Sequence, residues 1–429
     1  MSKGIEYLYE HYSATGKVST DTRMVTPGSI FFALRGEKFN ANKFATEAIQ
    51  KGASLAVIDE EEFAKDDRYI VVTDVLQTLQ RLARYHRDRL EIPIIALTGS
   101  NGKTTTKELI NAVLGKKFRT FATRGNLNNH IGVPLTMLGI DASIEVAVVE
   151  MGANHVGEIE ILCRIANPTH GFITNIGKAH IGTFGGYENI IKAKSELYHH
   201  LLSTGGIVFV NSANPILVEL AESFRQRVTY PAPGDFYAAR LISADPTVMI
   251  KAENGDMVQT QLVGSYNFEN IACALCIGKY FGVDAKLAHE AISEYAPGNM
   301  RSQVVVKGTN TIILDAYNAN PSSMQAAIEN LALLKAENKV LILGDMFELE
   351  EEAQKEHQAI GALIRENGFR NVYLCGALFK SALHEIPYAK YFEKKEDLIK
   401  NIKLYPLSDA TVLVKASRGM GLETVMEFL

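Results

Sequence analysis

The stretch Thr98-Gly-Ser-Asn-Gly-Lys-Thr-Thr-Thr-Lys-Glu108 decides the fold of this chain. It follows the apolar run Ile92-Pro-Ile-Ile-Ala-Leu97, which predicts a buried strand, and it precedes apolar residues at helical spacing. Glycines in such a turn let backbone N–H groups face phosphate oxygens, and the start of the helix adds partial positive charge. The stretch therefore predicts a site for a nucleoside triphosphate.

Two side chains of this loop have distinct expected roles. Lys103 can reach the outer phosphates, and the hydroxyl of Thr104 can ligate Mg²⁺. The longer pattern G-x-x-x-x-G-K-[ST] requires a glycine at position 97, where this chain has Leu97. The residues expected to bind phosphate are Gly99, Ser100, Asn101, Gly102, Lys103, Thr104 and Thr105.

Composition limits the classes of function. The 429 residues predict two to four domains, and the net charge of −5 gives no general reason to expect nucleic acid as a partner. No apolar run suits membrane insertion, and the first residues lack an apolar signal segment, so a cytoplasmic protein is expected. The four cysteines are interpreted as buried core thiols, because Cys273 and Cys276 lack further ligands for zinc.

The chain is expected to form three α/β units, at 1–88, 89–297 and 298–429, joined at the second boundary by a linker at 297–299. The middle unit alternates strands and helices, the pattern of a mostly parallel sheet covered on both faces. The predicted strands are 29–34, 55–58, 94–98, 146–150, 171–175, 207–211, 311–315, 340–343, 372–375 and 411–415. The predicted helices include 42–51, 75–89, 267–281 and 323–336, whereas 230–262 is only turn-rich.

Polar residues follow several predicted strands, at the edge where doubly wound sheets bind ligands. Glu150 ends one strand and is placed to hold Mg²⁺ directly or through water. His180 also follows a strand, and its position favours a structural and a functional role equally. Lys194 lies in a helical stretch and, taken alone, indicates a solvated helix face.

Two asparagines and two charged residues complete the candidates. Asn267 and Asn270 open the helix predicted at 267–281, and their amides can pair with an adenine edge. Asn267 can equally cap that helix. Arg301 and Asp315 can face the crevice between the last two units, although each alone is more typical of a surface residue.

With these positions identified, the whole chain resembles the Mur ligase family. The family's short phosphate loop, T-G-x-x-G-K-T-T, is the form at 98–105, which accounts for Leu97. Other family segments appear as GNLNNHIGVP at 125–134, EMG at 150–152, TNIGKAH at 174–180 and AKSE at 193–196. The resemblance implies an N-terminal UDP-binding α/β domain, a central P-loop ATPase domain and a C-terminal Rossmann-like domain.

Within the family, the chain is most similar to the branch that joins D-alanyl-D-alanine to a UDP-linked tripeptide. This similarity rests on DAYNANPSSM at 315–324, LGDMFEL at 343–349 with His357, and KASRGM at 415–420. The segment STDTR at 19–23 resembles the UDP-binding domain of the later-acting ligases. Two positions depart from the family pattern, Tyr266 in place of His in the adenine segment and Ala416 in place of Gly.

The resemblance implies a cytoplasmic step of peptidoglycan synthesis, in which a monomer uses ATP to form an acyl phosphate and then an amide. It implies two Mg²⁺ ions, one held by Thr104 and Glu150, the other by His180 and a carbamylated Lys194. That role replaces the solvated-face interpretation of Lys194. The implied catalytic residues are Lys103, His180, Lys194 and Arg301.

The resemblance also implies contacts with the nucleotide and the two substrates, UDP-N-acetylmuramoyl-tripeptide and D-alanyl-D-alanine. The residues implied for the nucleotide outside the phosphate loop are Asn267, Asn270, Arg301 and Asp315. The residues implied for the substrates are Ser19, Thr20, Asp21, Thr22, Arg23, Asn128, Asn129, Asn318, Asn320 and Ser322.

Four alternatives are weighed against this interpretation. The nearest is the sister ligase that adds the third amino acid, whose D-[DN]-P-[RN] motif is not found here. A folylpolyglutamate synthetase lacks a domain ahead of its phosphate loop. A nucleotide-binding scaffold would not need Glu150, His180 and Lys194, and a simple P-loop kinase would need a lid that no pattern supports.

Overall fold

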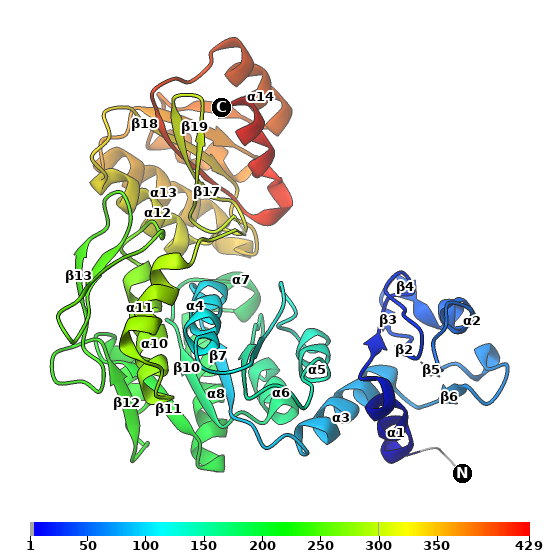
Figure 1. The fold of residues 1–429 in the computed structure, drawn as a ribbon. Coiled ribbons are helices and arrows are strands. Elements are labelled where there is room, and N and C mark those ends of the chain that lie inside the picture. The colour runs from blue at the N-terminus through cyan, green and yellow to red at the C-terminus, as the bar shows by residue number, and fades with distance from the viewer. Residues whose placement is uncertain (1–3, 299) are drawn as a thin grey trace.

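A computed structural model describes residues 4–298 and 300–429, which form three α/β domains in series (Figure 1). The N-terminal domain lies to one side of the central domain, and the C-terminal domain sits above the central one. This arrangement confirms the predicted fold class. The predicted linker at 297–299 falls partly outside the described residues, as does the start of the first predicted unit. Every described helix is too short or too polar to cross a lipid bilayer.

The N-terminal domain is built on a parallel sheet of four strands in the order β1-β2-β5-β6. Alternate side chains of β2 enter different cores, because successive residues of a strand point to opposite faces. Ile30 and Phe32 pack in the core that contains α1 and α3, whereas Phe31 packs in the core that contains α2. Its strands are β1 (Val18–Ser19), β2 (Ile30–Phe32), β5 (Leu55–Ile58) and β6 (Tyr69–Val71), and its helices are α1 (Ile5–Thr15), α2 (Ala45–Gln50) and α3 (Val75–Arg87).

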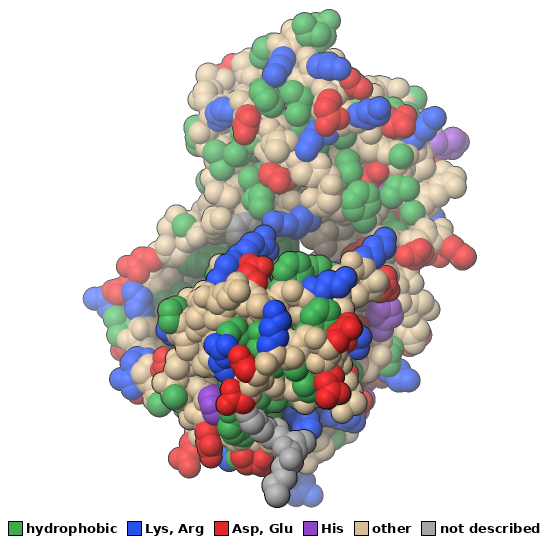
Figure 2. All heavy atoms as spheres, turned by 90° about the vertical axis from the view of Figure 1, so that its right-hand side faces the viewer, with side chains coloured by type: hydrophobic (Ala, Val, Ile, Leu, Met, Phe, Trp, Pro, Cys, Tyr) green, Lys and Arg blue, Asp and Glu red, His purple; other side chains and the backbone are tan. Residues whose placement is uncertain are grey.

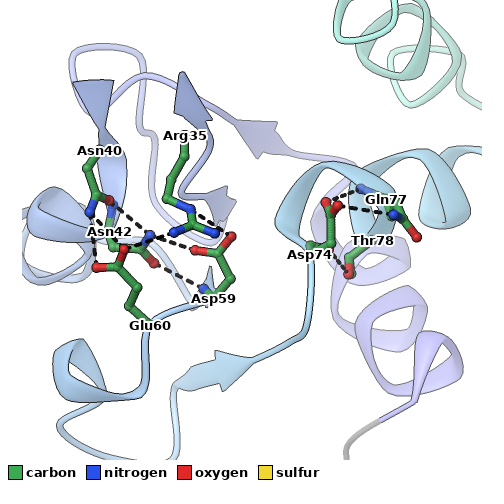
Figure 3. A network of polar contacts seen from close by, with 8 residues as sticks. All are labelled: Arg35, Asn40, Asn42, Asp59, Glu60, Asp74, Gln77 and Thr78. Atoms are coloured by element: carbon green, nitrogen blue, oxygen red, sulfur yellow. Dashed lines mark hydrogen bonds and ion pairs between the residues drawn. The ribbon is translucent and has the colours of Figure 1, made fainter. Parts of the chain in front are cut away.

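A polar network holds the hairpin β3 (Arg35–Gly36) and β4 (Phe39–Asn40) against the end of β5 (Figure 3). Arg35 pairs with Asp59 and Glu60, each at 3.1 Å. The buried Asn42 donates to Asp59 at 2.7 Å. Nearby, Asp74 caps the helix α3 that leads into the central domain. These bonds fix the hairpin to the end of the strand β5.

The central domain carries a six-stranded, all-parallel sheet in the order β12-β11-β10-β7-β9-β8. The strand β7 lies between β10 and β9, so the chain leaves it at a point where the sheet order reverses, and ligands bind at such points. The strands are β7 (Ile94–Thr98), β8 (Thr120–Ala122), β9 (Val146–Glu150), β10 (His170–Ile173), β11 (Ile207–Asn211) and β12 (Arg227–Tyr230).

Helices cover both faces of this sheet (Figure 1). The helices are α4 (Lys103–Gly115), α5 (Gly132–Met137), α6 (Glu158–Ala166), α7 (Ile181–Phe184), α8 (Tyr187–Thr204), α9 (Pro215–Leu220), α10 (Asn267–Tyr280) and α11 (Ala285–Glu294). The stretch that the sequence indicated only as turn-rich forms a small antiparallel sheet of β13 (Arg240–Ser243), β14 (Met249–Lys251) and β15 (Met257–Gln259).

The C-terminal domain has a six-stranded sheet in the order β16-β17-β21-β18-β19-β20, parallel except for the edge strand β16. Its strands are β16 (Gln303–Lys307), β17 (Asn310–Asp315), β18 (Lys339–Gly344), β19 (Asn371–Cys375), β20 (Lys390–Phe392) and β21 (Thr411–Lys415). Its α-helices are α12 (Pro321–Leu333), α13 (Ala353–Glu366) and α14 (Lys395–Leu404).

The predicted elements are present, with two instructive shifts. The helix predicted at 42–51 is a 3₁₀ turn, Ala41–Phe44, followed by α2. The helix predicted at 323–336 begins earlier, because Asn320 accepts from the backbone N–H of Ser323 and Pro321 occupies the first turn. All four cysteines are buried, which confirms their interpretation as core thiols.

Candidate functional site

The phosphate loop leaves β7 in a conformation that requires glycine. Gly99 and Gly102 both have positive φ angles, 143° and 79°. A Cβ atom on Gly99 would lie 2.0 Å from Oγ1 of Thr174, so a side chain does not fit there. Leu97 is fully buried in β7, so the loop begins two residues later than in the longer pattern. Position 97 is therefore part of the core strand, where an apolar side chain fits.

Lys103 is folded back onto its own loop. Its Nζ donates to the backbone oxygen of Gly99 at 2.6 Å. Burial lowers the pKa of Lys103, the nearby carboxylate of Glu150 opposes that shift, and the charge of Arg301 adds to it. A phosphate placed on this loop would supply the negative charge that the buried ammonium lacks.

Glu150 ends β9 beside the start of α4, as the sequence predicted. Its Oε1 accepts from Asn128 Nδ2 at 2.8 Å and lies 3.4 Å from the hydroxyl of Thr104. Its buried Oε2 accepts no hydrogen bond within the described residues and lies 3.6 Å from Nζ of Lys107. A buried carboxylate oxygen without a hydrogen bond, next to a hydroxyl, fits a Mg²⁺ ligand set. Groups of three or more His, Cys, Asp or Glu suited to a metal are absent from the described chain.

His180 lies in the turn between β10 and α7 and has a left-handed backbone, with φ of 57°. Its Nδ1 pairs with the carboxylate of Glu348 from the C-terminal domain. This contact holds the pKa of Glu348 below its usual value. The histidine therefore lies on the boundary between two domains.

Lys194 is buried, so its interpretation as part of a solvated face was wrong. Only 2% of the residue is exposed, and Nζ lies 3.4 Å from the oxygen of Ala153 and 5.2 Å from the ring centre of Phe184. Burial, and secondly the positive charge of Lys103, lower the pKa of Lys194 to about 7. A lysine with this pKa is an uncharged amine about half of the time near neutral pH.

The helix α10 begins beside the phosphate loop. The expected capping role of Asn267 is wrong, because the cap position is Tyr266 and no side chain caps the helix. Asn267 sits one residue inside the helix and turns its amide back to the oxygen of Val263 at 2.8 Å. Asn270 donates to Asn267 at 2.9 Å and accepts from the hydroxyl of Thr106 at 2.9 Å. Tyr266 bonds instead with the hydroxyl of Ser302 at 2.7 Å.

The C-terminal domain brings Arg301 and Asp315 to the same crevice. The guanidinium of Arg301 lies 3.8 Å from the ring centre of Tyr317, and its Nε has no hydrogen-bond partner in the described chain. Asp315 pairs with Nζ of Lys415 at 2.5 Å. The residue Lys415 is 1% exposed, and the register of β17 with β21 places it opposite Asp315.

Sequence reasoning did not assign Lys415 to the site. The sequence did contain an indication of this role, because Lys415 is a charged residue at the end of a predicted strand, as Glu150 and Asp315 are. The pairing with Asp315 was not visible, because β17 and β21 are neighbours in space but about 100 residues apart in sequence.

Two cavities meet between the central and C-terminal domains. A nucleotide-side cavity of about 340 Å³ is lined by the phosphate loop, Tyr266, Asn267, Asn270, Arg301, Asp315, Asn320, Ser322 and Lys415. A second cavity of about 600 Å³ is lined by Asn129, Glu158, Phe347, Glu348, Ser417 and Arg418, among others. Five residues line both cavities: Lys103, Asn128, His180, Tyr317 and Asn318. Figure 2 shows Lys and Arg side chains gathered around the hollow at this level of the molecule.

Direct bonds hold the C-terminal domain on the phosphate loop. Asn320 donates to Asn101 at 2.8 Å. The backbone N–H of Lys178 donates to the hydroxyl of Ser322 at 2.9 Å, and its Nζ pairs with Glu356 at 2.7 Å. The two domains are therefore docked, with the cavities between them.

The segment 19–23 lies in the N-terminal domain and lines neither of these cavities. Asp21 pairs with the exposed Arg23 at 2.6 Å, and Ser19 is buried with its hydroxyl on the oxygen of Asp21. Its assignment to the UDP group stays a prediction.

Comparisons with known proteins agree along the chain. The family model of the Mur ligase middle domain matches residues 97–278, that of the Mur ligase glutamate ligase domain matches 300–418, and that of the Mur ligase family catalytic domain matches 16–87. The UDP-N-acetylmuramoyl-tripeptide–D-alanyl-D-alanine ligase of Bacillus subtilis is 35% identical over 96% of this chain and 92% of its own length. The ligase of the same name from Escherichia coli is 32% identical over 96% and 93%.

Solved structures give the same result. A crystal structure of MurF from Acinetobacter baumannii matches with a TM-score of 0.86 and 32% identity over 96% of this chain and 92% of that one. MurF ligase from Thermotoga maritima in complex with ADP matches with a TM-score of 0.84 and 26% identity over 96% of both chains. A folylpolyglutamate synthase from Mycobacterium tuberculosis, at 16% identity and a TM-score of 0.63, shares the fold over 82% of this chain and 94% of its own. The chain thus belongs to the Mur ligase family, in its group of UDP-N-acetylmuramoyl-tripeptide–D-alanyl-D-alanine ligases.

Proposed function

We propose that this chain is a cytoplasmic, monomeric ligase that uses ATP to join D-alanyl-D-alanine to UDP-N-acetylmuramoyl-tripeptide. The observation that carries the proposal is the border shared by the two cavities. Lys103 of the phosphate loop, His180 and Asn318 line both, so a phosphate held in one cavity faces a substrate held in the other. The relatives at 30–35% identity carry this activity in their names.

The reaction that fits this border has two steps. The terminal carboxylate of the tripeptide attacks the γ-phosphorus of ATP, which releases ADP and leaves an acyl phosphate. The uncharged amine of the dipeptide then attacks the acyl carbon, and the amide forms as inorganic phosphate and a proton leave. The first step brings two anions together, so it depends on fixed positive charge.

Lys103 and Arg301 supply that charge from two sides. Lys103 leaves Gly99 to meet the outer phosphates, and Arg301 faces the nucleotide cavity with its Nε free of hydrogen bonds in the described chain. Asn267, Asn270 and Tyr266 line the part of this cavity for the base. Asp315, paired with Lys415, lines the same cavity and would accept hydrogen bonds from ribose hydroxyls.

Two Mg²⁺ ions fit the donor groups. Thr104 and Glu150 would hold one, and His180 with a carbamate on Lys194 would hold the other. Bound Mg²⁺ would neutralise charge on the phosphates. The carbamate is supported by the burial of Lys194 and its pKa of about 7, since the uncharged amine is the form that adds CO₂. The carbamate offers oxygen atoms and negative charge to a metal, whereas a protonated lysine has no lone pair with which to bind one.

The tripeptide is expected to enter along the central-domain wall of the second cavity, where Asn128 and Asn129 lie. Its UDP group would extend to the segment 19–23. From the C-terminal domain, Asn318 lines both cavities, and Asn320 and Ser322 line the nucleotide-side cavity that adjoins the second one. Docking of that domain excludes water, which would otherwise hydrolyse an acyl phosphate.

The test is ADP release with UDP-N-acetylmuramoyl-tripeptide and ATP, with D-alanyl-D-alanine or single amino acids as acceptors. Sustained release and a pentapeptide product are expected only with the dipeptide. Release that needs a UDP-linked dipeptide and a free amino acid would favour the sister ligase, and none would favour a scaffold. Lys103→Ala should abolish release while the fold persists. Lys116→Ala should not, because Lys116 follows the last residue of the same helix and pairs with the exposed Glu294.

A further inference from the structure

The second cavity carries two charged groups that the nucleotide chemistry above does not use. Its C-terminal wall is formed by the segments that follow β18 and β21. The backbone N–H of Phe347 donates to the hydroxyl of Ser417 at 2.8 Å, which ties these segments together. Glu348 follows Phe347 and Arg418 follows Ser417, and both Glu348 and Arg418 line the cavity. One negative and one positive side chain therefore line the same wall of the cavity.

Glu348 holds its position at a conformational cost. Its φ angle is 64°, in the left-handed region that glutamate rarely adopts. Its carboxylate nevertheless reaches His180, on the border shared with the nucleotide cavity. A residue kept in a disfavoured conformation at a site border points to a role for its side chain.

Arg418 stands at the other part of the same wall. Its guanidinium lies 4.9 Å from the ring centre of Tyr317, and within the described chain it forms no ion pair. The same ring also contacts Arg301, which faces the nucleotide cavity. Arg418 is exposed to the second cavity and is free to bind an anion there.

We propose that Glu348 and Arg418 bind the two ends of the acceptor, its ammonium at Glu348 and its terminal carboxylate at Arg418. The inference rests on the proposed function. It sets the direction of the dipeptide, since the ammonium end then lies beside His180, where the acyl phosphate is formed. An arginine fork suits a carboxylate because it can donate two parallel hydrogen bonds.

Binding at both Glu348 and Arg418 would also let the enzyme select its acceptor by length. An extended dipeptide spans at most about 7 Å, roughly twice the span of one amino acid. The Phe347–Ser417 bond ties the two segments together, and we expect an acceptor with its charges only one residue apart to bind the pair more weakly than a dipeptide does. Glu348 and Arg418 thus act as specificity-determining residues.

The test for Arg418 compares two acceptors, D-alanyl-D-alanine and D-alanyl-D-alaninamide, which lacks the terminal charge. The unaltered enzyme should prefer the acid by about 10- to 100-fold in kcat/KM, the range of one charged hydrogen-bonded contact. Arg418→Ala should remove this preference by lowering kcat/KM for the acid alone. Equal loss for both acceptors, or no loss for either, would overturn the inference.

Arg370→Ala is the matched control. Arg370 is also an arginine of the C-terminal domain that lies over a tyrosine ring, 5.3 Å from the centre of Tyr388, and it lines neither cavity. It should retain the preference for the acid. If Arg370→Ala also loses the preference, the effect of Arg418→Ala comes from a less stable C-terminal domain and not from a lost contact with the acceptor.

The test for Glu348 distinguishes a role in binding the acceptor from a role in binding the metal. Glu348→Gln should raise KM for D-alanyl-D-alanine by about 10-fold or more, and Glu348→Asp should partly restore it. If Glu348→Gln instead raises the Mg²⁺ concentration needed for ADP formation without acceptor, the carboxylate belongs to the metal site and the inference fails. Absence of ADP release by the unaltered enzyme would reject the proposed function itself, which keeps the two failures distinct.

Discussion

The amide of Asn320 donates to the amide oxygen of Asn101 at 2.8 Å, across the boundary between the C-terminal and central domains. Asn101 is part of the phosphate loop, where its backbone N–H donates to the side chain of Asn175. Asn320 is the capping residue of α12. If the C-terminal domain moves away, this bond must break, so domain docking and the state of the loop are coupled.

Replacing Asn320 by Asp tests this coupling. Aspartate caps a helix as well as asparagine does, so the fold should keep its stability within about 0.5 kcal/mol. The substitution removes the donor to Asn101 and places a carboxylate beside bound phosphates. We expect kcat/KM for ATP to fall by about 10-fold or more, measured by steady-state ADP release alongside thermal unfolding.

Ser323→Ala is the control for Asn320→Asp. It removes the other half of the capping box, the bond from the backbone N–H of Asn320 to the hydroxyl of Ser323. This variant should lose about 0.5–1 kcal/mol of stability. Although Ser323 also lines the nucleotide-side cavity, the substitution adds no charge there and should leave kcat/KM for ATP nearly unchanged. Normal ATP kinetics in Asn320→Asp would show that the bond has no part in nucleotide binding.

Removal of CO₂ is expected to lower the activity if Lys194 is carbamylated. Since its pKa is about 7, the amine is uncharged often enough to add CO₂ with release of a proton. Degassed, CO₂-free buffer should reduce turnover, and bicarbonate should restore it. A carbamate signal should appear in ¹³C NMR after addition of ¹³C-bicarbonate. Lys192→Ala, an exposed neighbour on α8, should keep the signal and Lys194→Ala should lose it.

The part of the site that could be predicted from sequence is the part fixed by local pattern. Glu150 and the phosphate loop follow directly from strand ends, so a strand prediction places them. The small sheet of β13, β14 and β15 was missed because its strands have three or four residues each and carry no clear alternation.

The remaining features of the site depend on tertiary contacts, which local sequence patterns do not reveal. Lys194 looks like a solvated lysine because its helix has other polar residues nearby, and only the packing of Phe184 and Ala153 against it shows that it is buried. The ion pair of Asp315 and Lys415 depends on the order of strands in a sheet, which sequence spacing does not reveal.

The ion pair of the buried Lys415 with the partly buried Asp315 should be strongly coupled. Lys415→Met leaves Asp315 without its partner and should destabilise the C-terminal domain by about 3–5 kcal/mol. The double variant with Asp315→Asn should be more stable than Lys415→Met, because no carboxylate is then left unpaired. Urea unfolding of all three variants and the parent gives the coupling energy. Additive effects would mean that the pair contributes no mutual stabilisation.

The stability of the central domain should fall in acid through His170, at the start of β10 and away from the ligand edge. Burial near Phe209, Tyr280 and Phe281 lowers the pKa of His170 to about 4 from a usual value near 6.5. The unfolded chain therefore binds a proton that the folded chain does not, so stability is full above pH 6.5 and declines as the pH falls to 4.

His170→Phe removes this titration and keeps a ring in place. The difference in unfolding free energy between parent and variant should shift by about 3 kcal/mol between pH 7 and pH 4, and stay nearly constant above pH 7. Urea unfolding of the two proteins at matched pH values measures it. Because both proteins share every other titrating group, a difference that does not vary with pH would show that His170 is equally protonated in the folded and unfolded chain.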